Sequence, residues 1–221
     1  MHLQLWLMRL IDKGIFMSEQ YSIQSTSEEK LVANSPENKI AYHFSKIMEA
    51  LGLDLSDPSL KKTPQRVAKM YVKEVFSGLK QENFPSISTF PNKATPEDTQ
   101  IVLVKDITIH SFCEHHFVPM HGHAHIAYIP KDKLIGLSKL NRIAQFYSKR
   151  PQLQERLTKQ IADSLSEIME TEDVAVYIEA KHFCVCARGS QDQNSKTVTH
   201  SLQGSFKKDT LRRQEFFQMI S

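Results

Sequence analysis

The sequence predicts an α+β fold with an antiparallel sheet, and two observations support this prediction. Apolar residues recur at helical spacing in two separate stretches, roughly 38–78 and 138–168. Segments rich in β-branched residues lie in pairs before and after the second stretch. Paired strands on either side of a helix pair favour an antiparallel sheet over a doubly wound one.

The first helix is expected to begin near Asn38 and to end before Gly52. The second is expected to use Thr63 as its N-cap, with Pro64 at the first helical position, and to stop at Ser77-Gly78. In the later helix pair, Ser138 is expected to cap the first helix and Pro151 to open the second. A last helix is expected at 209–220.

Four segments have strand character. The first alternates Ile101, Leu103, Ile107 and Ile109 with polar or β-branched residues, which predicts one continuous apolar face. The four strands are expected at 101–110, 123–130, 174–186 and 197–204.

Composition excludes several classes of protein. The 221 residues carry 28 Lys+Arg against 25 Asp+Glu, and this balance argues against nucleic acid or a membrane surface as the main partner. Three cysteines are too few for a disulfide framework. No stretch approaches the ~20 apolar residues of a membrane helix. We expect a cytoplasmic protein.

The chain divides by composition into three parts. Residues 1–37 predict a flexible arm, in which 1–16 form an upstream extension if translation starts at Met17. The alternative for 1–16 is a short amphipathic helix that docks on the body. Residues 38–80 form an N-terminal helical segment and 81–221 the main domain.

The ten histidines are unevenly distributed. Within one short window lie Cys113 and six of the histidines: His110, His115, His116, His121, His123 and His125. Cys113 and His116 have the Cys-x-x-His spacing that lets one turn present two ligands to a metal ion. His121, His123 and His125 alternate and can equally form one solvated or interface face.

A third ligand is available much later in the chain. In an extended strand, His182, Cys184 and Cys186 would share one face. A site of Cys113, His116 and Cys184 has three protein ligands and leaves a position for water, as catalytic zinc sites do. The competing interpretation is chance spacing, with the cysteines as ordinary core residues.

Basic residues indicate an anion site. Ser138, Lys139 and Arg142 lie near the start of a helix, where free N–H groups and the helix dipole attract anions. Further basic residues in a nearly neutral chain suit a compact polyanion such as a triphosphate: Arg66, Lys69, Lys73 and Arg188. Each could instead belong to a solvated face. Beside an apolar stripe lies Gln154-Glu155, where a fixed carboxylate could accept from the N–H edge of a purine.

Five runs of sequence resemble one known family. They are TPQRVAKMY, CEHHFVPMHG, AYIPKDKLIGLSKLNRI, RPQLQERLTKQI and HFCVCARG. In this order, over roughly 38–220, the chain is similar to the zinc-dependent GTP cyclohydrolase I. The resemblance implies hydrolysis at C8 of GTP, release of formate and formation of 7,8-dihydroneopterin triphosphate, the first step of tetrahydrofolate and pterin synthesis. It also implies a tunnelling fold for 81–221 and a homodecamer with active sites between subunits.

The resemblance assigns roles to residues. It implies zinc (Zn2+) ligands Cys113, His116 and Cys184, and catalytic residues His115 and His182. We expect His182 to act as acid and base at the purine, and His115 to assist later proton transfers. It further implies that GTP is bound by Glu155, Gln154, Ser138, Lys139, Arg142, Arg188, Arg66 and Lys69.

Three other functions are alternatives to this interpretation. One is a related tunnelling-fold enzyme that acts on a pterin or deazapurine. A zinc nucleobase deaminase would carry H-x-E and P-C-x-x-C motifs, which the sequence lacks. The third is a zinc-stabilised oligomeric binding module, which would need a fourth protein ligand and would unfold on chelation.

Overall fold

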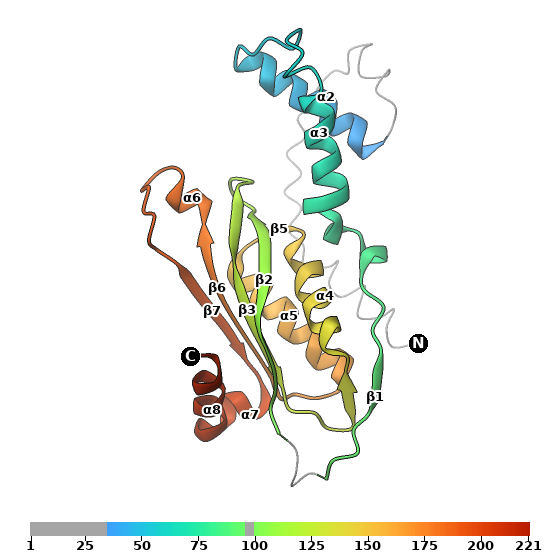
Figure 1. Cartoon of the computed structure of the whole chain (residues 1–221), viewed down its shortest axis with the longest axis vertical. Coiled ribbons are helices and arrows are strands. Elements are labelled where there is room, and N and C mark those ends of the chain that lie inside the picture. The colour runs from blue at the N-terminus through green and yellow to red at the C-terminus, as the bar shows by residue number, and fades with distance from the viewer. Residues whose placement is uncertain (1–34, 96–99) are drawn as a thin grey trace, which may run out of the picture.

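The computed structural model describes residues 35–95 and 100–221 (Figure 1). The arm expected at 1–37, including the extension 1–16 and Met17, lies outside these residues except for its last three. No helix in the described part of the chain is long and apolar enough to cross a membrane.

The main sheet has five strands in the order β5-β2-β3-β6-β7. Their bounds are β2 (Val102–Cys113), β3 (Pro119–Tyr128), β5 (Pro151–Gln152), β6 (Val174–His182) and β7 (Thr197–Leu202). The four long strands pair antiparallel, whereas β5 runs parallel to the end of β2. A second sheet pairs β1 (Thr89–Pro91) with β4 (Lys133–Ile135). The predicted α+β class with an antiparallel sheet is therefore confirmed.

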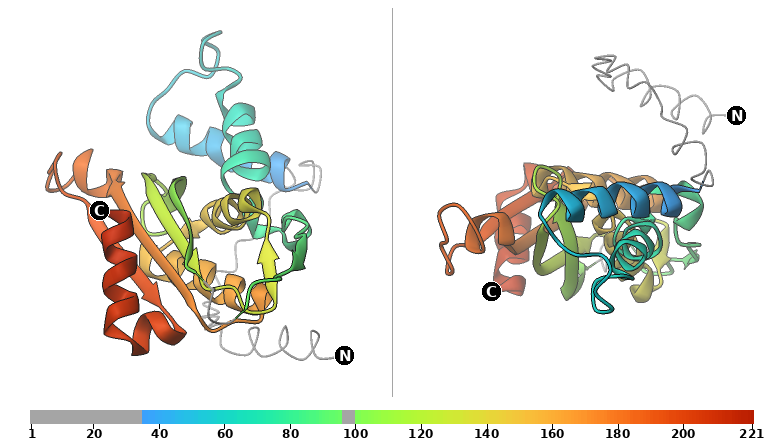
Figure 2. Two further views of the ribbon diagram at one scale, coloured as in Figure 1. Left: turned by 60° about the horizontal axis from the view of Figure 1, so that its bottom comes forward. Right: turned by 90° about the horizontal axis from the view of Figure 1, so that it is seen from above.

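One face of the sheet is covered by the expected helix pair, α4 (Leu137–Ser148) and α5 (Gln154–Met169). Leu140 and Ile143 of α4 and Leu157 and Ile161 of α5 are buried against the sheet. At one end of the opposite face lie α7 (Gly204–Lys208) and α8 (Thr210–Ile220), and Figure 2 shows the sheet between these helices and the α4/α5 pair. The last helix was expected, but α7 was not.

A β-bulge changes which face the residues of β2 occupy. The register steps from Val104 to Ile107 on β2 while β3 advances by only two residues, and Asp106 adopts a φ of 57°. Consequently Ile107 and Ile109 pack under α4 and α5, whereas Ile101 and Leu103 pack on the α7/α8 side. The prediction that these four residues share one face was wrong, because the extra residue inverts the alternation.

The N-terminal helices are α2 (Pro36–Ala50) and α3 (Thr63–Met70), and α3 continues into a π-helical turn, Tyr71–Val75. Short 3-10 turns follow at Ser77–Leu79 and Gln81–Asn83. The first helix begins two residues earlier than expected, because Ser35 caps it by accepting from the Asn38 N–H. Thr63 lies inside its helix and is not the N-cap.

Three further boundaries differ from the expectations. In the helix pair, Gly136 is the N-cap of α4 in place of Ser138, and Pro151 lies in β5 before α5 begins. The strand expected at 174–186 ends at His182, where the chain turns into the one-turn helix α6 (Phe183–Cys186).

Candidate active site

A tight turn at the end of β2 brings Cys113 and His116 together. The N–H of Cys113 donates to Val118 O, and the N–H of Phe117 donates back to Cys113 O, both at 2.9 Å. Phe117 has a φ of 52°, which lets the chain reverse within these few residues. As a result Cys113 Sγ lies 3.8 Å from His116 Nδ1.

Cys184 reaches the same point from α6. The turn of helix after His182 redirects Cys184, so that ligand atoms of Cys113, His116 and Cys184 all lie within 4.8 Å of one another. The expected common face of His182, Cys184 and Cys186 was wrong, since that rule holds only for an extended strand. Cys186 is buried, and its thiol donates to His182 O at 2.8 Å.

This group of donors suits a metal ion. Two thiols and an imidazole are the ligand types that zinc takes in proteins. Burial raises the pKa of Cys184, and the neighbouring Cys113 raises it further through a hydrogen bond and its charge. A cation between the sulfurs would remove this repulsion, so the chemistry of the three residues fits a bound metal.

Arg188 follows α6 and lies at the edge of the group. Its Nη1 donates to His116 Nε2 at 3.0 Å, and its side chain is otherwise exposed. A second cation, Arg156, forms an ion pair with Glu114, the residue after Cys113. Arg188 is thus the guanidinium group that is available to an anion beside the metal-binding group.

The short strand β5 positions the start of α5 beside the cysteines. Cys113 pairs with Gln152, and the N–H of Glu114 donates to Gln152 O at 3.1 Å. Gln154 and Glu155 follow directly in the first turn of α5. Two residues that the sequence separates from Cys113 by about forty positions are thereby brought to the same end of the sheet.

Gln154 is committed to contacts within the protein. Its side chain is 1% exposed, and its amide nitrogen donates to Ile178 O, Thr197 O and Thr199 Oγ1 at 3.0–3.1 Å. Its amide oxygen lies 2.7 Å from His182 Nε2. Direct binding of a substrate by this side chain, as the sequence suggested, does not agree with these contacts, because no N–H of the amide is left free.

These contacts also determine where His182 carries its proton. Since the two carbonyl oxygens can only accept, the nitrogen of the Gln154 amide faces them and its oxygen faces His182. Nε2 of His182 is therefore the donor, and Nδ1 keeps a lone pair in the neutral ring. Burial lowers the pKa of His182, and the charge of the nearby Glu155 raises it by a smaller amount.

Glu155 and His115 are accessible near the metal-binding group. Glu155 is exposed in the first turn of α5, where the helix dipole favours a carboxylate. His115 is exposed in the turn after β2, with its ring centroid 6.2 Å from that of His116 and nearly perpendicular to it. Both side chains can therefore contact a molecule that enters from solvent.

The residues expected to bind an anion at the start of α4 lie away from the metal-binding group. Ile135 lies just before α4, and its N–H donates to the hydroxyl of Tyr128, the last residue of β3. His182, in contrast, pairs with Met120, the second residue of β3. The ten residues of β3 span about 30 Å. Ser138 and Lys139 are thus near the far end of the sheet, where Lys139 Nζ donates to Ser86 O at 2.6 Å.

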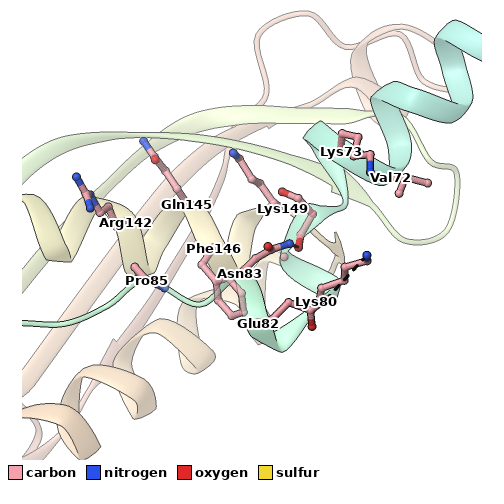
Figure 3. Close-up of a pocket in the computed structure, with 12 residues that line it drawn as sticks. Val72, Lys73, Lys80, Glu82, Asn83, Pro85, Arg142, Gln145, Phe146 and Lys149 are labelled. Carbon is pink, nitrogen blue, oxygen red and sulfur yellow. Dashed lines mark hydrogen bonds and ion pairs between the residues drawn. The ribbon is translucent and has the colours of Figure 1, made fainter. Parts of the chain in front are cut away.

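The remaining basic residues are also apart from the cysteines. Arg142 lines a cavity of about 500 Å³ between α4 and the 3-10 turns (Figure 3). That cavity also presents Lys73, Lys80 and Lys149. Arg66 and Lys69 are exposed on α3. Within one chain the structure therefore brings together the metal-binding group, both histidines, Gln154, Glu155 and Arg188, but not the other basic residues.

Comparison with known proteins gives one consistent family. The family described as GTP cyclohydrolase I matches residues 40–221. Proteins named GTP cyclohydrolase 1 are similar to the chain: that of Erwinia tasmaniensis is 56% identical over 82% of this chain and 81% of its own length. That of Haemophilus ducreyi is 48% identical over 96% and 93%.

A solved structure is similar to part of the chain. The archaeosine synthase QueF-Like in its apo form covers 49% of this chain and 94% of its own, with 14% identity and a TM-score of 0.40.

Proposed function

The chain belongs to the GTP cyclohydrolase I family, and from that premise we propose how its residues hydrolyse GTP. The reaction opens the imidazole ring of GTP at C8, releases formate and yields 7,8-dihydroneopterin triphosphate. The observation that best supports this function is the group of Cys113, His116 and Cys184 beside His182 and the start of α5. Three protein ligands, an accessible carboxylate and a half-buried histidine suit hydrolysis of a purine ring.

Cys113, His116 and Cys184 hold a zinc ion in this proposal. When bound, the ion supplies a Lewis acid that lets water act as a nucleophile near neutral pH. Three protein ligands are typical of a catalytic site, whereas a structural site would use four. Cys186 is not a ligand, since its thiol is directed to His182 O.

His182 moves a proton at the purine. Its Nε2–H is fixed on Gln154, so Nδ1 is the atom that takes a proton and passes it to N7, which makes C8 more electrophilic. Its lowered pKa keeps the ring neutral and able to accept that proton near pH 7. Gln154 positions His182, and His115 assists the later proton transfers, including the opening of the ribose ring.

Glu155 recognises the guanine edge. Its carboxylate is exposed beside the metal-binding group, where it can accept two hydrogen bonds from neighbouring N–H groups of the base. Arg188, at the edge of the same group, binds the phosphates. Contacts to the base and to the phosphates would together hold C8 near the zinc ligands.

The site is completed by further copies of the chain. Ser138 and Lys139 lie toward the end of the sheet opposite the cysteines, about 15 Å along α4 from Ser148, which lies at the cysteine end. If they bind the triphosphate with Arg142, Arg66 and Lys69, they do so at the metal site of a neighbouring copy. This separation supports a homo-oligomer with interfacial active sites, which we propose to be the tunnelling-fold decamer of the family.

The function is tested by incubating the protein with GTP and measuring formate and, after oxidation, pterin fluorescence. We expect turnover that a chelator removes and zinc restores. His182→Ala should abolish formate release with zinc content unchanged, whereas His200→Ala, a change at an exposed histidine of β7, should not. Full turnover in His182→Ala would refute the proton-transfer role.

The metal assignment has its own pair of variants. Cys113→Ser should lose zinc and turnover together, because serine is a poor zinc ligand. Cys186→Ser is the matched control and should keep both, since a hydroxyl can still donate to His182 O. A protein that binds zinc and unfolds on chelation but never turns over GTP would instead be a zinc-stabilised binding module.

A further inference from the structure

Three exposed histidines lie together on the sheet face opposite α4 and α5. His110 on β2 pairs directly with His121 on β3, and His123 follows two residues later on the same face. The helices α7 and α8 cover the other end of this face, from Ala127 and Ala175 to Tyr177 and His200, whose rings contact Phe217 of α8. The histidines therefore lie on the uncovered part of this face in the described chain.

Two of their nitrogens are spaced for chelation. Nδ1 of His110 and Nδ1 of His121 form a hydrogen bond of 3.0 Å, so the proton that one of them carries must move to Nε2 when a metal ion binds, and the two rings stack with centroids 4.5 Å apart. Two nitrogens each about 2.05 Å from one metal ion would be 3.0 Å apart at a ligand angle of about 95°. This angle suits the tetragonal geometry of Ni(II) or Cu(II), and a small opening suits tetrahedral zinc.

A third nitrogen is close to this pair. The ring centroid of His123 lies 6.0 Å from that of His121, so that a change of side-chain rotamer would bring it to the same ion. His125, the next residue on this face, differs: it is 8% exposed, and its Nδ1 accepts from the Asp106 N–H. The available ligands are thus His110, His121 and His123.

The surrounding charges are mixed. Lys181 lies opposite His121 on β6 and disfavours a second cation. Glu179 lies opposite His123 and favours one, although its carboxylate is paired with Lys196 at 2.6 Å. Burial lowers the pKa of His110, as do the charges of His121 and His123.

We propose that His110, His121 and His123 form a second site for a divalent transition-metal ion, separate from the cysteine-containing site. The ion would join β2 to β3 on the face that the helix pair does not cover. Because this site has no thiolate, it should bind more weakly than the first and exchange its metal freely.

The test uses the full chain without a histidine tag, with its cysteine-containing site first filled by one equivalent of zinc. Ni2+ is then added in equilibrium dialysis, and bound nickel is measured by elemental analysis at pH 7.5. We expect one nickel per chain, without the thiolate charge-transfer absorption that binding to Cys113 or Cys184 would give. Binding should weaken at least tenfold at pH 5.5, where protons compete for the imidazoles.

Variants assign the site to residues. His110→Gln and His121→Gln should each lose the nickel, whereas His200→Gln, which alters another exposed histidine on this face, should keep it. Zinc content and GTP turnover of the histidine variants should remain those of the unchanged protein, which shows that they are folded. Unaltered nickel binding in both variants, or no nickel bound by the unchanged protein, would overturn the proposal.

Discussion

At the scale of the residue, Gln154 shows how one side chain determines the chemistry of another. Its nitrogen faces carbonyl oxygens of two strands, and this fixes its oxygen on His182 Nε2. The resemblance to the family implied a catalytic role for His182, but no pattern in the sequence suggested this positioning role for Gln154. The acceptors come from β6 and β7, 24 and 43 residues away, and only the fold brings them together.

Gln154→Met tests this positioning role. Methionine keeps the length of the side chain but loses every hydrogen bond, so His182 can adopt the wrong tautomer. We expect kcat to fall about 10- to 100-fold, with KM for GTP and zinc content nearly unchanged. Glu155→Gln should show the contrasting effect, a raised KM. A higher KM with unaltered kcat in Gln154→Met would mean that Gln154 contacts the substrate after all.

His125 predicts a pH dependence of stability. Burial lowers its pKa, and the charge of Asp106 only partly opposes this effect. Since the pKa is lower in the folded state than in the unfolded state, the unfolded state binds more protons as the pH falls below about 6.5, and the folded state loses stability. Above about pH 6.5 the full contribution of the neutral His125 to the stability of the folded state is present.

Urea unfolding at pH 7.5 and 5.5 measures this effect. The midpoint should fall at the lower pH, and it should fall less in His125→Gln, whose amide can still accept from the Asp106 N–H. Hydrogen bonds lower the pKa values of Asp54, Asp57 and Asp192, which moves the titration of these three carboxylates farther from this window. An equal fall in both proteins would show that His125 is not responsible.

At the scale of the element, the sequence predicted most helices and strands but not the places where they change direction. Alternation of apolar residues located β2, yet the bulge at Asp106 inverted its faces. The same kind of error affected the metal-binding group: an extended strand was expected to present Cys184, but a turn of helix brings it to Cys113. Such turns depend on neighbouring strands, which a local pattern does not contain.

Gly122 tests how closely β3 and β6 must approach. A Cβ at this position would lie 1.9 Å from Glu179 O and 2.8 Å from the Ala180 Cβ. Gly122→Ala must therefore separate the strands, which should cost about 1–3 kcal/mol and lower Tm by several degrees in a thermal scan. Turnover should fall as well, because Met120, two residues away, pairs with His182.

Gly136→Ala provides the control for this substitution. Its added Cβ would lie 3.6 Å from the Lys139 Cγ, an ordinary contact, and at a helix N-cap the change should cost no more than about 1 kcal/mol. An equal loss of stability in the two variants would show that the close approach of the strands is not the cause.

At the scale of the whole molecule, the residues that we propose to bind GTP lie toward both ends of the sheet. The cysteines, His182 and Glu155 lie at one end of the sheet, whereas Ser138 and Lys139 lie at the other. Sequence motifs identified both groups, but no motif states whether two groups belong to one site in one chain or to a site shared by two. The length of β3 and the direction of α4 support the shared site that we propose.

Mixed oligomers test whether active sites are shared. His182→Ala and Lys139→Ala should each be nearly inactive alone. The first cannot transfer the proton, and the second has lost a contact to the triphosphate. Co-expressed with two different tags and purified through both, their hybrids should contain sites that take an intact His182 from one copy and an intact Lys139 from another. With random assembly of equal amounts, about a quarter of the wild-type activity should return. If both residues served a site within one chain, every site would lack one of them, and hybrids as inactive as their parents would reject the shared site.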